Sequence, residues 1–271
     1  MTHFRRTRLV AVSAAAIVAA VALAGCGSSG KSSSATSTPG AGSSANLSGT
    51  ITVLAAASLT GTFNQLGQMF QATHPGTTIK FSYGGSDTLA AQIVQGAPVD
   101  VFAAASPTTM KTVTDAGDNA GTPQNFVKNQ LVIAVPPGNP KHLASLKDLT
   151  DPKLKVVLCA PTVPCGTAAT KAEQAAGLTI KPVSEAPDVK SALTPVELGE
   201  ADAALVYRTD AKAAAGKVDA VEFPESALAI NTYPIVALKG SKNIALANAW
   251  VSYIVSPEAL AVFTAAGFQA P

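Results

Sequence analysis

From Thr50 onward, apolar runs of strand length alternate with amphipathic stretches of helix length, and this alternation restricts the fold more than any other feature. We predict the first strands over residues 51–57, 78–83 and 99–104. The first helix begins at Ser58, because apolar side chains recur there at helical spacing: Leu59, Phe63, Leu66, Met69 and Phe70. Further helices are predicted over residues 88–95 and after Ser106-Pro107. Such alternation is typical of an α/β fold, in which helices cover both faces of a parallel sheet.

A second set of strands and helices follows a polar stretch at residues 118–124. Strands are predicted over residues 130–135, 155–159 and 203–206, with helices over 165–176 and 187–198. The strand at 235–238 and the helix at 244–255 return to the first set. We therefore expect two lobes with a ligand cleft between them, and a chain that crosses twice from one lobe to the other. The expected boundaries are residues 50–129 and 233–271 for lobe 1 and residues 130–232 for lobe 2.

The segment before this body has the features of a secretory signal. Arginines at positions 5, 6 and 8 precede an apolar run from Leu9 to Gly25, and small residues lead into Cys26. Residues 23–26 (LAGC) resemble a bacterial lipobox, which implies a signal peptide over residues 1–25 and lipidation of Cys26. A single membrane-spanning anchor is the alternative, although no basic flank follows the run. No other run approaches the roughly 17 to 25 apolar residues that span a bilayer.

Residues 26–49 consist mainly of glycine, serine, alanine and threonine, which predicts a flexible tether. Residues 25–32 match the phosphate-loop pattern G-x-x-x-x-G-K-[ST]. That pattern binds nucleotides only between a strand and a helix, and neither is expected here, so we reject this function. Removing residues 1–25, which hold three arginines and no acid, changes the formal charge from +2 to −1. The body therefore has no basic excess to attract a nucleic acid.

The chain has three cysteines, of which two lie in the body. If Cys26 carries a lipid, Cys159 and Cys165 remain, and an exported compartment is oxidising enough for them to pair. A disulfide across so short a loop would contribute about 2 kcal/mol in the chain-entropy estimate. The alternative is two independent buried thiols.

Ser58 and Ser86 each lie where a predicted strand turns into a helix. In open α/β sheets ligands bind at this end of the strands, and the free backbone N–H groups of a helix start favour anions. Each serine taken alone is also a normal helix cap. Two such turns in one lobe favour an anion site.

Several segments of the body resemble the molybdate-binding proteins of ABC importers, in the order that these proteins have them. The resemblance begins with the run at residues 52–60 (TVLAAASLT) and spans nearly all of residues 51–268. The further segments are SDTLAAQI (86–93), GAPVDVF (96–102), VPCG (163–166), PDVKSAL (187–193), ALVY (204–207), YPI (233–235) and AGF (266–268). The resemblance implies a two-lobed, periplasmic-binding-protein-like α/β fold of type II, with a mostly parallel sheet in each lobe.

The resemblance also implies a set of ligand-binding positions. In that family two serines, backbone N–H groups and a tyrosine hold the oxyanion, and the matching positions here are Ser58, Ser86, Cys165, Val189 and Tyr207. Cys165 stands where alanine is more usual, so its N–H would bind while its side chain pairs with Cys159. Tyr207 on its own would be read as a core residue at the end of a strand. The assignment of Val189 to the site rests on the family match alone.

Such a site holds a dianion without lysine or arginine, so every oxygen of the ligand needs a neutral donor. A protonated oxyanion such as hydrogen phosphate brings a hydrogen that finds no acceptor, at a cost of about 1 to 3 kcal/mol. We therefore expect molybdate, and also tungstate, to bind, with sulfate as the alternative ligand. Asp87 is expected to face solvent at the helix start.

An exported serine hydrolase is the alternative from another class, with Ser58 or Ser86 as nucleophile and His74 or His142 as base. The chain lacks the G-x-S-x-G turn of such enzymes, and its histidines have no metal-ligand spacing. We therefore expect no enzyme activity and no cofactor. The resemblance implies a monomeric binding protein, lipid-anchored on the extracytoplasmic face of the membrane, that delivers molybdate to an ABC permease and its ATPase.

Overall fold

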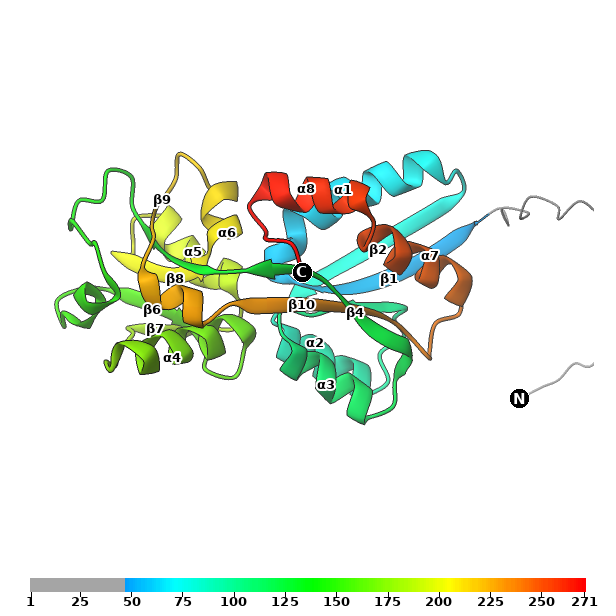
Figure 1. Ribbon diagram of the computed structural model, residues 1–271, viewed down its shortest axis with the longest axis horizontal. Helices are drawn as coiled ribbons and strands as arrows, with labels where there is room; N and C mark the ends of the chain where they lie inside the picture. Colours follow the sequence, from blue (N-terminus) through cyan, green and yellow to red (C-terminus); the bar gives the residue numbers. More distant parts are fainter. Residues whose placement is uncertain (1–46) are drawn as a thin grey trace, which may run out of the picture. The chain divides into compact units, whose positions relative to one another are not determined.

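The computed structural model describes residues 47–271 (Figure 1). The predicted signal peptide, Cys26, the phosphate-loop match and nearly all of the predicted tether lie outside these residues. Two five-stranded sheets, here called sheet A and sheet B, organise the described part. The predicted α/β fold with two helix-flanked sheets is confirmed.

Sheet A has the strand order β2-β1-β3-β10-β4. Strands β1, β2 and β3 are parallel to one another, and β10 is antiparallel to both β3 and β4. Only β10 therefore runs against the other four, so the sheet is mostly parallel, as predicted. The strands are β1 (Gly49–Ala56), β2 (Thr77–Gly84), β3 (Val101–Ala103), β4 (Asn119–Asn129) and β10 (Asn231–Leu238).

Helices cover both faces of sheet A. Alternate side chains of β1 point to opposite faces and pack in two separate apolar clusters, which the helices complete. Ile51 and Val53 pack in the cluster that also holds Phe63 and Trp250, whereas Leu54 packs with Leu89. Helices α1 (Thr60–Thr73), α7 (Ile244–Ile254) and α8 (Pro257–Ala266) contribute to the first cluster. Helices α2 (Ser86–Val94) and α3 (Pro107–Asp115) contribute to the second, on the other face (Figure 1).

Sheet B has the order β7-β6-β8-β5-β9 and surrounds its own apolar cluster. Strands β6, β7 and β8 are parallel, and β5 is antiparallel to β8 and β9, so again one strand runs against four. The strands are β5 (Leu131–Val135), β6 (Val156–Cys159), β7 (Ser184–Ala186), β8 (Ala203–Tyr207) and β9 (Asp219–Val221). The helices are α4 (Pro164–Ala176), α5 (Val189–Glu197) and α6 (Arg208–Ala213), with the short 3-10 helices η2 (Leu146–Thr150) and η3 (Pro224–Leu228).

The chain crosses between the sheets at two places. The strand that follows each crossing, β5 or β10, is the one that runs against the other four strands of its sheet. Gln130 links β4 of sheet A to β5 of sheet B, and β10 returns the chain from sheet B to sheet A. The polar stretch at residues 118–124, where no strand was predicted, lies largely in β4. Most side chains in that part of the strand are exposed or half-buried, so a polar sequence can form it.

Candidate binding site

A small pocket lies where strand ends and helix starts of both sheets meet. The space open to the centre of a water-sized sphere is about 20 Å³, which is far less than the roughly 300 to 1,000 Å³ of sites for drug-sized molecules. The pocket therefore suits a small ion. All five residues that the sequence predicts as ligand-binding line it: Ser58, Ser86, Cys165, Val189 and Tyr207.

Sheet A contributes the two serines. Ser58 lies in the 3-10 helix η1 (Ala57–Leu59) after β1, and Ser86 is the first residue of α2 after β2. Neither serine caps its helix through its side chain, so the helix-cap interpretation does not hold. Instead the Ser86 hydroxyl accepts a hydrogen bond from the Ala105 N–H at 3.0 Å. The Ser58 hydroxyl lies 2.9 Å from that of Tyr233.

The start of α4 brings Cys165 to the pocket. Cys165 forms a disulfide with Cys159 at the end of β6. These cysteines are therefore paired and are not two independent thiols. The next residue has to be glycine, because a Cβ on Gly166 would lie 1.9 Å from the Ala160 carbonyl oxygen. The disulfide and this close contact hold the first turn of α4, whose N–H groups have no preceding helical carbonyl to bond.

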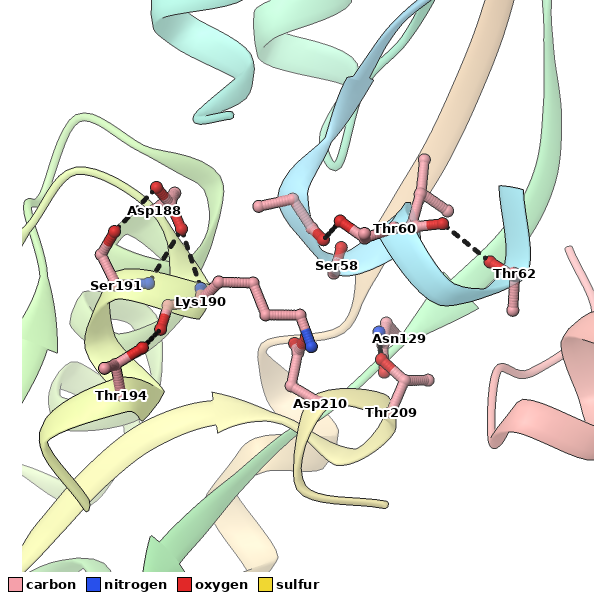
Figure 2. A network of polar contacts seen from close by, with 12 residues as sticks. Ser58, Thr60, Thr62, Asn129, Asp188, Lys190, Ser191, Thr194, Thr209 and Asp210 are labelled. Atoms are coloured by element: carbon pink, nitrogen blue, oxygen red, sulfur yellow. Dashed lines mark hydrogen bonds and ion pairs between the residues drawn. The ribbon is translucent and has the colours of Figure 1, made fainter. Parts of the chain in front are cut away.

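The start of α5 presents the N–H of Val189. Asp188 caps this helix: its Oδ1 accepts from the N–H of Lys190 at 2.8 Å and of Ser191 at 3.0 Å (Figure 2). The cap satisfies the second and third N–H groups of the helix and leaves the first one, that of Val189, for the pocket. The carboxylate of Asp188 is thereby occupied by its own helix, although Asp188 lines the pocket.

Tyr207 ends β8 and offers the clearest unused donor. Its side chain is 1% exposed, and its hydroxyl has no hydrogen-bond partner among the described residues. Burial, with the neighbouring Tyr233 and Asp210, raises the pKa of Tyr207 well above its ordinary value, so the hydroxyl keeps its hydrogen. Buried polar atoms are nearly always hydrogen-bonded, so an unpartnered hydroxyl at a pocket wall indicates a ligand that accepts from it.

Asp188 is the only charged residue among the described residues that line the pocket, and its carboxylate bonds its own helix. No lysine, arginine or histidine is among the described residues that line it, so neither His74 nor His142 can serve either serine as a base there. Asp87 does not line it either, but the expectation that this residue faces solvent was wrong in part. The side chain is half-buried, and its Oδ1 is buried without a hydrogen-bond partner among the described residues.

Sequence reasoning missed a buried carboxylate close to the site. Asp210 is 1% exposed, and the Lys190 Nζ lies 3.1 Å from its Oδ1 (Figure 2). Burial raises the pKa of Asp210 to about 6, against the opposing effect of Lys190. Its position just after the Tyr207 strand end was visible in the sequence, but no pattern indicated that it is buried.

Two asparagines beside the crossings were also missed. Asn129, at the end of β4, donates to the Thr209 hydroxyl at 2.8 Å and to the Tyr233 hydroxyl at 3.4 Å. Asn231, at the start of β10, donates to the carbonyl oxygens of Ala105 at 2.7 Å and Pro164 at 3.3 Å. Both side chains are buried and join groups on the two sides of the pocket, which no local sequence pattern could show.

Comparison with known proteins gives consistent matches over the described body. The family model of a bacterial extracellular solute-binding protein matches residues 51–269. The molybdate-binding protein ModA of Mycobacterium tuberculosis is 42% identical over 94% of this chain and 97% of its own length. ModA of Escherichia coli is 34% identical over 81% of this chain and 89% of its own. The solved periplasmic molybdate-binding protein of Azotobacter vinelandii superposes with a TM-score of 0.70 at 25% identity, covering 82% of this chain and 99% of its own.

Proposed function

The chain belongs to the family of bacterial extracellular solute-binding proteins, and we propose that it binds molybdate, and also tungstate, for delivery to an ABC importer. The relatives are solute-binding proteins and not enzymes. The observation that carries the proposal is the Tyr207 hydroxyl, which is buried at the pocket and has no hydrogen-bond partner in the described part of the chain.

The donors of this pocket can replace the water shell of a tetrahedral dianion. Hydroxyl groups of Ser58, Ser86 and Tyr207 and helix-start N–H groups at Cys165 and Val189 line it from both sheets. Hydrogen bonds to a charged group contribute about 1.5 to 3 kcal/mol each. Each helix start adds up to about 2 kcal/mol in favourable geometry. Neutral donors can therefore hold the ion without an opposite charge.

The same donor set favours oxyanions that carry no hydrogen. Molybdate, tungstate and sulfate are fully deprotonated near neutral pH, whereas phosphate keeps at least one hydrogen. That hydrogen would lie in the pocket without an acceptor, at a cost of about 1 to 3 kcal/mol. Sulfate is the second candidate ligand because it presents the same four acceptors.

Closure of two lobes is part of the proposal. The lobes are sheet A with its helices and sheet B with its helices, and the hinge lies at the crossings beside Asn129 and Asn231. The ion would bind donors of one lobe first, and the other lobe would complete its shell. A permease with its ATPase would then recognise the closed form. We further propose that lipidated Cys26 holds a monomeric protein on the extracytoplasmic face of the membrane.

Calorimetric titration of the protein with molybdate, tungstate, sulfate and phosphate tests this function. We expect one molybdate per chain and weaker binding of sulfate and phosphate. Sulfate bound as tightly as molybdate would overturn the specificity, and the absence of molybdate binding would overturn the function.

A further inference from the structure

We propose that Asn129 and Tyr233 fix the direction of the hydrogen bonds at Ser58, so that its hydroxyl presents its hydrogen to the ligand. Neither residue lines the pocket, and both would act on the ligand through Ser58 as positioning residues. The inference rests on the proposed function and adds to it a cause of specificity, namely the rejection of protonated oxyanions.

The side-chain amide of Asn129 has a defined orientation. A backbone N–H can only donate, and that of Gln130 lies 3.0 Å from the Asn129 Oδ1, which identifies this atom as the oxygen. The other atom, Nδ2, carries two hydrogens and faces the Thr209 hydroxyl at 2.8 Å (Figure 2). It also lies 3.4 Å from the Tyr233 hydroxyl. Tyr233 therefore accepts from Asn129.

The Tyr233 hydroxyl must then direct its own hydrogen to Ser58. Burial raises the pKa of Tyr233, so the phenol is neutral and has one hydrogen to donate. Two hydroxyls lie near that of Tyr233: Ser58, at hydrogen-bond distance of 2.9 Å, and Tyr207, which forms no hydrogen bond within residues 47–271. We therefore assign the hydrogen of Tyr233 to Ser58, which leaves the hydrogen of Ser58 free to point into the pocket that it lines.

The Ser86 hydroxyl also accepts a hydrogen bond from inside the protein, but its donor is a backbone N–H. Its hydroxyl accepts from the Ala105 N–H at 3.0 Å, so its hydrogen is also free for the ligand. Both serines thus accept a hydrogen bond from inside the protein, and each has its own hydrogen free to donate to the ligand. A hydrogen on the ligand meets another hydrogen at either position, which is the unpaired contact that disfavours hydrogen phosphate.

The variant Tyr233→Phe removes the donor behind Ser58 without changing the size of the ring. We expect molybdate and sulfate affinities to fall together by about tenfold, because the Ser58 hydroxyl is no longer polarised or oriented. Phosphate affinity should fall less or rise, since the Ser58 hydroxyl can then rotate and accept. Tyr253→Phe is the matched control, because the Tyr253 hydroxyl contacts Glu258 at an exposed position.

A second variant, Asn129→Asp, reverses the direction of the bonds. A carboxylate cannot donate to Tyr233 and would accept its hydrogen, so Ser58 would donate to Tyr233 and face the ligand as an acceptor. We expect a larger loss of molybdate affinity than in Tyr233→Phe. Asn125→Asp, on the same strand but exposed, controls for the added charge. If Asn129→Asp does not fold, as judged by circular dichroism, Tyr233→Phe decides.

The readout is the ratio of molybdate to phosphate dissociation constants, from calorimetric titration of each anion and by competition. If Tyr233 had only a structural role, its loss would weaken the binding of both anions equally and leave the ratio unchanged. A Tyr233→Phe protein in which phosphate gains nothing relative to molybdate overturns the inference, including the case in which phosphate binding is undetectable. Failure of the wild-type protein to bind molybdate would instead reject the proposed function.

Discussion

Gly85, just before α2, and Pro187, just before α5, approach so closely that a Cβ atom on Gly85 would lie 2.5 Å from the Pro187 carbonyl oxygen. Gly85 belongs to the sheet A side of the pocket and Pro187 to the sheet B side. A contact at this distance is shorter than real Cβ atoms tolerate, so any larger residue has to move one of the two helix starts.

We therefore predict that Gly85→Ala weakens anion binding by tenfold or more, because the helix starts of the two sides can no longer approach fully. Calorimetric titration with molybdate measures the loss. Gly61→Ala is the matched control, since a Cβ there meets nothing within 4 Å, and it should bind as the wild type does. Unchanged affinity in Gly85→Ala would show that this close approach is not needed for binding.

Tyr207→Phe removes one hydroxyl that has no hydrogen-bond partner within residues 47–271. If the ligand accepts from it, the variant loses one hydrogen bond to a charged group, or about 10- to 100-fold in affinity. Its stability without ligand should stay near that of the wild type, because no internal bond is lost. Equal affinity in variant and wild type, measured by titration, would place Tyr207 in the core with no contact to the ligand.

The Cys159–Cys165 disulfide should stabilise the body by constraining a short loop, with a sequence separation of six residues. Replacing both cysteines with alanine should lower the free energy of unfolding by about 2 kcal/mol. Urea denaturation of the variant and of the wild type, each without reductant, measures the difference. Mass measurement after alkylation checks the pairing itself: two reactive thiols in the wild-type protein would contradict it.

Asp210 makes the stability depend on pH. Its pKa of about 6 in the folded protein exceeds the roughly 3.9 of an unfolded chain, so the unfolded state loses this proton first as the pH rises. The contribution of Asp210 to stability therefore falls between about pH 4 and pH 6, by on the order of 3 kcal/mol, and is constant above.

Asp210→Asn should remove this slope, so that the variant gains stability relative to the wild type between pH 4 and pH 7. Lys190 can turn to solvent in the variant, because 39% of its side chain is already exposed. Urea denaturation at several pH values tests the expectation. Asp115→Asn, which breaks an exposed pair with Lys111, should follow the wild-type profile. Parallel profiles for Asp210→Asn and wild type would contradict the assignment.

The sequence could predict the strands that are buried on both faces, because they are continuous apolar runs. Residues 131–135 and 203–207 are of this kind, and every residue in them is buried. The sequence did not predict β4, because the exposed half of this strand is polar. It also gave no prediction for β7 and β9, which have three residues each and carry little pattern.

The five predicted site residues line one pocket, but the sequence did not indicate which residues support them. Ser58 and Ser86 follow from the strand-to-helix turns, and Val189 came from the family resemblance alone. The support of Ser58 by Tyr233 joins residues 175 positions apart. Contacts of that kind depend on how β1 and β10 are placed in sheet A, and no local spacing encodes them.

Anomalous X-ray diffraction from crystals grown with molybdate, recorded at the molybdenum absorption edge, locates the bound ion. We expect one molybdenum peak per chain, inside the pocket, with the hydroxyl groups of Ser58, Ser86 and Tyr207 and the N–H groups of Cys165 and Val189 within hydrogen-bond distance of the molybdate oxygens. A pocket without a molybdenum peak, or one occupied by an organic molecule, would contradict it.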